Sequence, residues 1–363
     1  MGDYSQYIAP ERRSVPTPRH MVENGKCVFG TFDKEFETMD FLEIDHPTSA
    51  PDLFRKWKLT LWEAVEVHLE EGVLLCACCD MGIFGQVMNL FYDKRKKKVY
   101  SWAVKIPSQN ASVAENLLSG SETKATGKHL SFQCVNDLQE GRCQVRGWQE
   151  DKTGRIEYDF SLTRLSDPSV VSIPLEDPAV RHRPVYTQKD FFRCSGWLKI
   201  NGETFRATET STAILDDHKA YYPRKAHFDW VSTMGVNETD GEKKWFAFNL
   251  TRNQSVDQEK YNENLIWLEN ETSLLPPVKF TRDIPTLKFK DGARWYIKDE
   301  HDMVNVTFHV CDIFRMVTHA KPLVNIEYFV AFGELEGYVR DESGKKYILD
   351  GMIGMGEDKT LLL

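Results

Sequence analysis

The chain has 363 residues, of which 41% are hydrophobic and 12% aromatic, so it can bury large cores and is not globally disordered. Its formal net charge of −9 argues against nucleic-acid binding, because recognition of phosphates needs a basic face. This length favours two domains. We therefore expect a globular protein whose partner is a small, neutral or weakly polar molecule.

The N-terminal sequence has no apolar signal region, and the eight cysteines are scattered along the chain. This pattern differs from the dense cysteines of a disulfide scaffold, so we expect reduced thiols and a cytoplasmic protein. Residues 1–50 are polar and rich in turn-forming residues. We interpret them as an N-terminal arm that lies over the first domain without joining its sheet.

Short runs of β-branched and aromatic residues, bounded by Gly, Asn or Asp, fill most of the remaining chain. Polar and apolar residues alternate in the runs 62–69, 143–148 and 304–310, which predicts strands with one buried face. Helices are expected only as short stretches near 51–57 and 113–118. The sequence thus predicts an all-β protein with few short helices.

The stretch 72–91 is apolar over about one bilayer thickness, but Gly82 and Gly85 interrupt it. We interpret it as two buried strands joined by a turn, and expect no integral membrane segment. It includes Cys76 and Cys79 at Cys-x-x-Cys spacing. No second close cysteine pair completes a metal site, so buried structural thiols are expected.

The basic run from Lys94 to Lys98 follows this stretch and falls between two predicted strands. One interpretation is a solvated hairpin turn. The other is recruitment to an acidic membrane surface, so weak membrane-surface contact through this run stays open.

Four prolines lie between residues 166 and 186, and proline disfavours both helix interiors and central strands. We therefore take 171–186 as a Pro-rich connection. It would separate a first β domain at 51–170 from a second at 187–363.

The stretch 215–230 has the highest density of chemically active side chains. Asp217 and His218 could form an acid–base pair, because imidazole titrates near neutral pH and a nearby carboxylate tunes it. Tyr222 and Arg224 would lie on one side of an extended Tyr-Pro-Arg segment, where they could hold or polarise an oxygen.

An alternative interpretation makes 215–230 a structural hydrogen-bond network that plugs a barrel mouth, with Trp230 in the core. Motifs for dinucleotide and phosphate loops, zinc proteases and nucleophile elbows are absent from the sequence. His301, His309 and His319 lack metal-ligand spacing. We therefore expect no cofactor and no metal, and any catalysis would be cofactor-free acid–base chemistry.

Several short motifs occur in a preserved order: Lys56-Trp57, Asp80-Met81-Gly82, Leu215-Asp216, Tyr222-Pro223-Arg224, Trp230, Asn262-Glu263-Asn264-Leu265-Ile266-Trp267, Phe332-Gly333 and Gly354-Met355-Gly356-Glu357-Asp358. In these motifs the chain resembles the bacterial and protist family known as DUF2804. The resemblance implies two consecutive calycin/lipocalin-like antiparallel β-barrels or sandwiches, akin to those of AttH-like proteins and carotenoid hydratases. Such barrels enclose apolar ligands. The family brings no settled activity, and Lys359 departs from the His that many members place after the Glu-Asp pair.

The leading hypothesis is binding of a small hydrophobic or amphipathic ligand, of lipid or isoprenoid type, in a β-barrel cavity. The residues expected to bind it are Tyr222, Arg224, His227, Trp230 and Asn264. The alternative is a cofactor-independent hydratase, isomerase or cyclase in which Asp217 and His218 are catalytic. A third hypothesis is an interaction scaffold that docks through residues 94–98.

Overall fold

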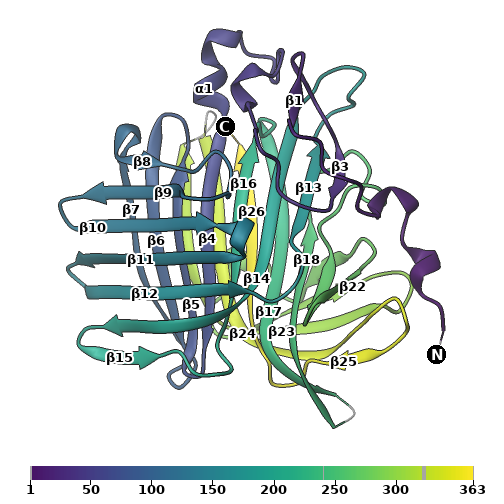
Figure 1. The fold of residues 1–363 in the computed structure, drawn as a ribbon. Helices are drawn as coiled ribbons and strands as arrows, with labels where there is room; N and C mark the ends of the chain where they lie inside the picture. Colours follow the sequence, from purple (N-terminus) through teal and green to yellow (C-terminus); the bar gives the residue numbers. More distant parts are fainter. Residues whose placement is uncertain (1, 240, 321–323, 363) are drawn as a thin grey trace. The chain divides into compact units, whose positions relative to one another are not determined.

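The computed structural model describes residues 2–239, 241–320 and 324–362. Within them nearly all regular structure is β, so the all-β prediction is confirmed (Figure 1). The one α-helix in the described residues is α1 (Arg55–Lys58). The remaining helical elements are short 3-10 turns: η1 (Ser5–Tyr7), η2 (Pro10–Arg12), η3 (Phe41–Glu43), η4 (Asp52–Phe54), η5 (Ser108–Asn110), η6 (Leu138–Glu140) and η7 (Thr286–Lys288).

The chain divides into two compact units. The barrel unit comprises Ser14–Phe91 and Tyr100–Tyr222, and the half-barrel unit comprises Met1–Arg13, Tyr92–Val99 and Pro223–Leu363. This division differs from the expected connection at 171–186. That stretch contains most of β13 (Ser169–Pro174) and the start of β14 (Pro184–Ile200), which pair with each other. Pro174 and Pro184 stand at strand ends, where a missing N–H is tolerated, and Pro178 lies in the turn between them.

The barrel unit is built on one sheet with the strand order β7-β6-β5-β4-β16-β14-β12-β11-β10-β9-β8. Strands β13, β15 and β3 extend it, since β13 and β15 pair with β14 and β3 pairs with β13. Because β8 and β9 return to contact β5, the sheet forms a nearly closed barrel. The bounds are β3 Gly30–Phe32, β4 Thr60–Leu69, β5 Gly72–Asp80, β6 Phe84–Asp93, β7 Lys98–Pro107, β8 Ala111–Ser112, β9 Ser121–Gly127, β10 Leu130–Asp137, β11 Arg142–Asp151, β12 Gly154–Arg164, β15 Glu203–Arg206 and β16 Thr212–Ala220.

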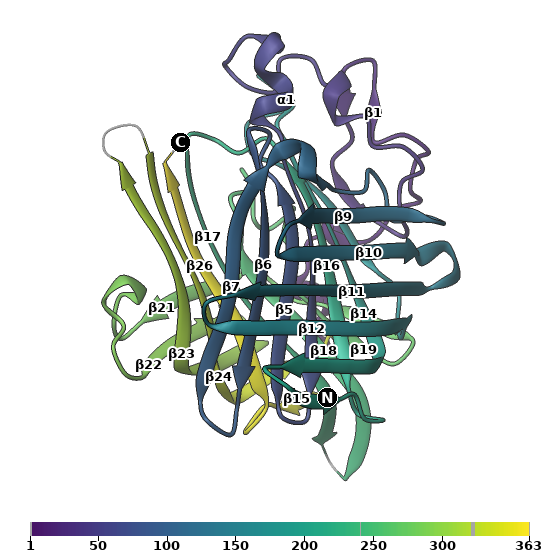
Figure 2. The same ribbon diagram turned by 90° about the vertical axis from the view of Figure 1, so that its left-hand side faces the viewer.

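An apolar core lies inside this barrel. Strands β9 to β12 cross over β4 to β7 (Figure 2), and side chains such as Leu74, Phe132 and Phe160 form one buried cluster. In β10 and β12 buried residues alternate with more exposed ones, as expected for strands with one wet face. Strand β16 is buried along its whole length, so both of its faces hold side chains away from water.

The first fifty residues lie outside the sheet except for β3. Strands β1 (Val22–Glu23) and β2 (Lys26–Cys27) form a separate two-stranded sheet. The apolar side chains Met21, Phe36 and Ile44 form a small core together with Tyr186 and Tyr221. This hydrophobic contact holds residues 21–44 in place where strand pairing is sparse. Residues 1–13 instead belong to the half-barrel unit, whose core includes Ile8, so the expectation that the whole arm lies over the first domain is wrong for them.

The half-barrel unit contains a second sheet with the strand order β20-β19-β18-β17-β26-β24-β23-β22-β21, and β25 pairs with β24. Its core includes Phe246, Phe248, Trp295 and Phe308. At the bulge in β23, a Cβ on Gly333 would lie 1.9 Å from the carbonyl oxygen of His309, so only glycine fits. The bounds are β17 Lys225–Thr239, β18 Glu242–Arg252, β19 Leu265–Leu268, β20 Glu271–Leu274, β21 Lys279–Arg282, β22 Ala293–Lys298, β23 Val304–Ala320, β24 Val324–Arg340, β25 Lys346–Ile348 and β26 Ile353–Leu362.

Most local predictions agree with these elements. The stretch 72–91 forms β5, a turn and most of β6, so the two-strand interpretation is confirmed. Of the helices in the described ranges, none has the length and apolar character that crossing a membrane requires. The helix expected near 113–118 is absent from the structure. There the backbone N–H of Ala114 bonds to Thr123 Oγ1 and that of Leu118 bonds to Asn116 Oδ1, in place of helical partners.

Candidate functional site

Strand geometry separates the two residues expected to form an acid–base pair. Asp217 and His218 are consecutive in β16, and consecutive strand residues point to opposite faces of a sheet. Asp217 pairs with Lys219 and lies near Glu63, whereas His218 stacks on Trp62. The expected pair therefore does not form one reaction site in the structure.

Asp217 belongs to a group of buried charged side chains that we call the barrel acid cluster: Glu63, Asp217 and Lys219. The Lys219 ammonium donates to Asp217 Oδ2. Glu63 accepts hydrogen bonds from the Thr123 hydroxyl and, at 3.0 Å, from Asn136 Nδ2. Since Thr123 and Asn136 lie on β9 and β10, the cluster extends across the barrel interior from β4 and β16.

The barrel acid cluster is short of positive charge. Burial raises the pKa of Asp217 to about 6 against the opposing attraction of Lys219, and burial also raises the pKa of Glu63. Among the described residues, Asp217 Oδ1 is buried without a hydrogen-bond partner. A carboxyl group in this situation can hold or release a proton near neutral pH, as a general acid or base must.

Asp190, on the adjacent strand β14, shows the same pattern. Arg164 pairs with both Asp190 and Glu35, and Gln188 Nε2 donates to Asp190 Oδ2 at 2.8 Å. Burial raises the pKa of Asp190 to about 6, although Arg164 opposes the shift. Since one guanidinium serves two carboxyl groups, this part of the interior is also short of positive charge.

His218 lies in an aromatic stack on the other face of β16. Its ring centroid is 4.3 Å from that of Trp62 and 6.3 Å from that of Tyr222. Its Nδ1 lies 4.0 Å from Asp216 Oδ1, which pairs with Lys189 at 3.0 Å. Burial opposes ionisation of Asp216, but Lys189 and His218 outweigh it and hold its pKa well below the usual value. This face therefore holds an ionised carboxylate in an ion pair.

Four of the residues expected to bind a ligand, Arg224, His227, Trp230 and Asn264, belong to the half-barrel unit, and Tyr222 belongs to the barrel unit. Arg224 is exposed. Trp230 is buried and donates from Nε1 to Asn249 Oδ1 at 2.6 Å. Asn264 accepts from the Thr251 amide at 2.7 Å and donates to the Pro276 carbonyl at 2.9 Å, so its contacts stabilise the local backbone. Their role in ligand binding stays a prediction.

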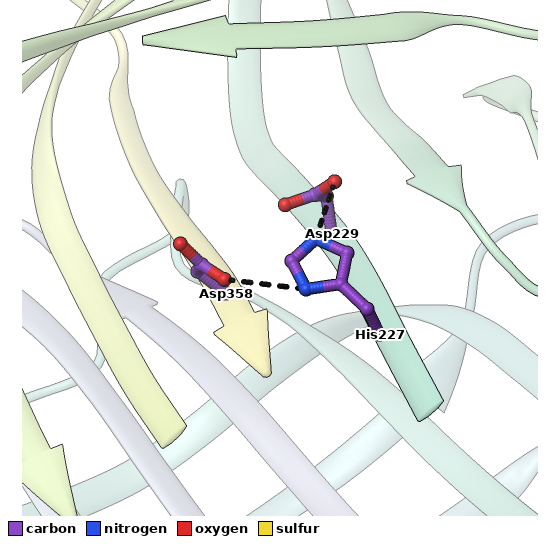
Figure 3. Close-up of side chains that lie close together, drawn as sticks. All are labelled: His227, Asp229 and Asp358. Carbon is purple, nitrogen blue, oxygen red and sulfur yellow. Dashed lines mark hydrogen bonds and ion pairs between the residues drawn. The ribbon is translucent and has the colours of Figure 1, made fainter. Parts of the chain in front are cut away.

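His227 lies between two carboxylates on β17 and β26 (Figure 3). Its Nε2 lies 3.3 Å from Asp229 Oδ2, and its Nδ1 lies 2.7 Å from Thr360 Oγ1 and 3.9 Å from Asp358 Oδ1. Asp229 and Asp358 are partners in the register of these two strands. We call His227, Asp229 and Asp358 the half-barrel cluster.

Two guanidinium groups neutralise the half-barrel cluster. Arg252 and Arg282 both pair with Asp229, and Arg282 Nε also lies 3.4 Å from Asp358 Oδ2. Burial opposes ionisation, but His227 and Arg282 lower the pKa of Asp229 to about 2. The ligand atoms of the cluster lie within 4.8 Å of one another, close enough for one cation. However, guanidinium groups already bind both oxygens of Asp229 and would repel a metal ion.

A groove of about 920 Å³ opens in the barrel unit beside β7, next to the β9–β10 and β11–β12 turns. We call it the barrel groove. Ile106 and Leu130, both part of the apolar core, line it together with the buried Gln149. Trp102 Nε1 donates to the Gly154 carbonyl at 3.0 Å and so ties the β11–β12 turn to β7. The residues expected from the sequence to bind a ligand do not line this groove.

Positive charge predominates around the barrel groove. Arg155 pairs with Glu150 at 3.3 Å, and Asp151 accepts from the Thr153 amide at 2.7 Å. Across the described ranges, the three lysines of the lining form no ion pair. The charged lining residues are Lys105, Lys128, Lys152, Arg155, Glu150 and Asp151, a formal excess of two positive charges.

Sequence reasoning missed Glu63, Asp229 and the barrel groove. The run 62–69 looks like a strand with one wet face, yet Glu63 is 0% exposed. A signal was present, because Glu63 and Glu66 are three residues apart and must point to opposite faces of a strand. No local pattern in the sequence indicates the barrel groove, because segments far apart in the sequence form it.

Residues 94–97 of the basic run form the turn between β6 and β7, and Lys98 begins β7, so the hairpin interpretation is confirmed. Arg95 and Lys96 pair with Asp93, and Lys97 pairs with Glu334 at 3.2 Å. Three of the five positive charges of this run are thus paired with carboxylates of the half-barrel unit. Docking to a membrane or to a protein partner through this turn stays a prediction.

The sequence matches the domain of unknown function DUF2804 over residues 12–361, so the chain belongs to this family, as its motifs predicted. Similar solved structures include the following two. Kievitone hydratase from Nectria haematococca is 9% identical in sequence, with a TM-score of 0.48. The match covers 84% of this chain and 88% of the hydratase chain. A putative AttH from Nitrosomonas europaea is 13% identical in sequence, with a TM-score of 0.45. The match covers 83% of this chain and 91% of the AttH chain. No curated protein matches the sequence.

Proposed function

We propose that this protein binds a small hydrophobic or amphipathic molecule, of lipid or isoprenoid type, in the barrel groove. The groove itself is the observation on which this rests. Its volume of about 920 Å³ is within the range of roughly 300–1,000 Å³ that small-molecule sites occupy. Ile106, Leu130 and Val104 give it apolar surface, and burying an alkyl tail there would gain about 0.8 kcal/mol per methylene.

The proposal is tested by measuring binding and then filling the groove. Gently purified protein is examined by native mass spectrometry for a retained lipid-sized mass, and displacement of a fluorescent fatty-acid probe gives affinities. Ala103 is exposed and lines the groove, so Ala103→Trp should weaken probe binding about tenfold or more. The matched control is Ala179→Trp, an exposed position of the same unit outside the groove lining. Equal binding by both variants and the wild type would place the ligand elsewhere.

A second candidate function is cofactor-free acid–base catalysis inside the barrel, giving hydration, isomerisation or cyclisation. One observation favours it: Asp217 is buried, its pKa is raised to about 6, and its Oδ1 has no partner in the described part of the chain. In this version Lys219 and Glu63 surround the proton-transferring group, and His218 on the opposite face takes no part.

Isotope incorporation tests this catalytic candidate without a known product. A panel of unsaturated lipids and isoprenoids is incubated with the protein in heavy water, and mass spectrometry follows deuterium uptake into the lipid. Catalysis predicts uptake that is lost in Asp217→Asn and kept in His218→Gln. Absence of uptake above the protein-free background across the panel, or uptake that survives in Asp217→Asn, would contradict it.

A further inference from the structure

We propose that the ligand of the barrel groove is an amphiphilic anion, a long-chain carboxylate whose charged head is held by lysines at the groove rim. The inference rests on the proposed function, because it assigns the chemical class of the same ligand. We expect the carboxylate to belong to a single dissolved molecule and not to a lipid in a membrane surface.

Charge supports this assignment. The chain has a net charge of −9, yet the groove lining has a formal excess of two positive charges. Glu150 is already engaged by His129 at 3.1 Å and by Arg155 at 3.3 Å. The lysines therefore have no carboxylate partner of their own in the described residues, and an anionic head would supply one.

The positive charges come from three segments that border the apolar floor. Lys105 lies on β7, Lys128 lies in the β9–β10 turn and Lys152 lies in the β11–β12 turn. Figure 2 shows these hairpins crossing the strands that include β7. Ile106 and Leu130 lie within the same lining. A tail on this floor would thus place a negative head among the lysines.

Gln149 adds a directional hydrogen-bond donor at the groove floor. The Tyr158 hydroxyl donates to Asn89 Oδ1 at 2.9 Å, and Asn89 Nδ2 donates to Gln149 Oε1 at 2.8 Å. The carbonyl end of Gln149 is therefore occupied. Its Nε2 makes no hydrogen bond within the described residues, although the side chain is buried and lines the groove. A carboxylate oxygen would satisfy this donor.

The test compares dodecanoic acid with dodecanol, which share the alkyl tail and differ in the head. In probe displacement at low salt, the acid should bind about tenfold more tightly than the alcohol. The triple variant Lys105→Gln/Lys128→Gln/Lys152→Gln should remove this preference by weakening acid binding about tenfold. Added salt should weaken acid binding alone. The control is Lys199→Gln, an exposed lysine of the barrel unit outside the groove lining.

The outcomes separate this inference from the proposed function. If neither compound binds, the proposed function is wrong. If both bind equally in the wild type, the amphiphile-binding function stands and the anionic class is wrong. If the triple variant keeps its preference for the acid but loses binding to vesicles that contain an anionic lipid, the lysines serve a membrane surface and the inference is also wrong.

Discussion

Two equally buried aspartates in this molecule respond to burial in opposite ways. Asp217 in the barrel unit and Asp229 in the half-barrel unit are each 1% exposed. The pKa of Asp217 is raised to about 6, whereas that of Asp229 is lowered to about 2. The difference lies in their neighbours, because His227 and Arg282 lower the pKa of Asp229, while Asp217 has Lys219 and the repulsion of Glu63.

The neighbours of a buried carboxylate decide whether its pKa rises or falls. Removing a carboxylate from water favours its neutral form, and nearby cations together with hydrogen bonds to the ionised form can reverse that preference. Asp229 is therefore an ionised carboxylate held between guanidinium groups, an arrangement suited to holding strands together. Asp217 in the barrel acid cluster can change its protonation near neutral pH, which is why the catalytic candidate centres on it.

The largest expected effect is the removal of a guanidinium from the half-barrel cluster. Arg282→Met leaves the buried Asp229 with less compensation and should lower the free energy of unfolding by about 3 kcal/mol. The measurement is urea unfolding followed by tryptophan fluorescence. The matched control is Arg294→Met, an exposed arginine on β22, which should change stability by less than about 0.5 kcal/mol.

A double variant shows whether the uncompensated charge causes this loss. Arg282→Met/Asp229→Asn should recover part of the stability, since the neutral amide needs no guanidinium partner. If Arg282→Met alone costs no more than the Arg294→Met control, pairing with Arg282 is not what stabilises the half-barrel cluster.

A smaller effect concerns the pH dependence of the barrel acid cluster. Because the pKa of Asp217 rises from 3.8 to about 6 on folding, the folded protein keeps a proton that the unfolded chain loses. This contribution is fully present below pH 3.8 and is lost as pH rises through about 6. Asp217→Asn should therefore reduce the loss of stability between these pH values by on the order of 2 kcal/mol. Urea unfolding over this pH range measures the change.

Asp229→Asn is the control, because the pKa of Asp229 shifts in the opposite direction on folding. The pKa of Asp229 falls from 3.8 to about 2 on folding, so its contribution is present above pH 3.8 and lost as pH falls through about 2. This variant should lower stability throughout the neutral range, where Asp229 is ionised in the folded protein. Identical slopes for Asp217→Asn and the wild type would contradict the raised pKa of Asp217.

The fold was largely predictable because its signals are local. Alternation in 62–69 and the glycine-interrupted run 72–91 correspond to β4, β5 and β6. The connection at 171–186 was misplaced, because prolines at strand ends resemble prolines in a linker until the pairing is known. Pro174 and Pro184 are in fact register partners at the end of the β13–β14 ladder.

The candidate sites were less predictable because distant segments build them. Sequence proximity suggested that Asp217 works with His218, but strand alternation puts them on opposite faces and gives Asp217 the neighbours Lys219 and Glu63. Strand pairing between β17 and β26 brings Asp358 to His227. A single sequence does not reveal which strands pair, so these partners could not be predicted.

The smallest expected effects come from replacing one threonine by valine beside each cluster. Thr123 donates its hydroxyl to Glu63 and Thr286 donates to Asp358 at 2.6 Å, and both threonines are buried. Thr286→Val should cost about 1 kcal/mol, since a carboxyl oxygen loses a hydrogen bond. Thr123→Val should cost more, since the Ala114 backbone N–H also loses its acceptor. Urea unfolding at pH 5 and pH 8 measures both variants.

The pH dependence of these two losses distinguishes the clusters. Burial already raises the pKa of Glu63, so removing the Thr123 donor should raise it further and make Thr123→Val more costly at pH 8 than at pH 5. Thr286→Val is the comparison in the half-barrel cluster, where Asp358 also has Arg282 at 3.4 Å. Equal pH dependence in the two variants would mean that the balance of cations does not set the difference between the clusters.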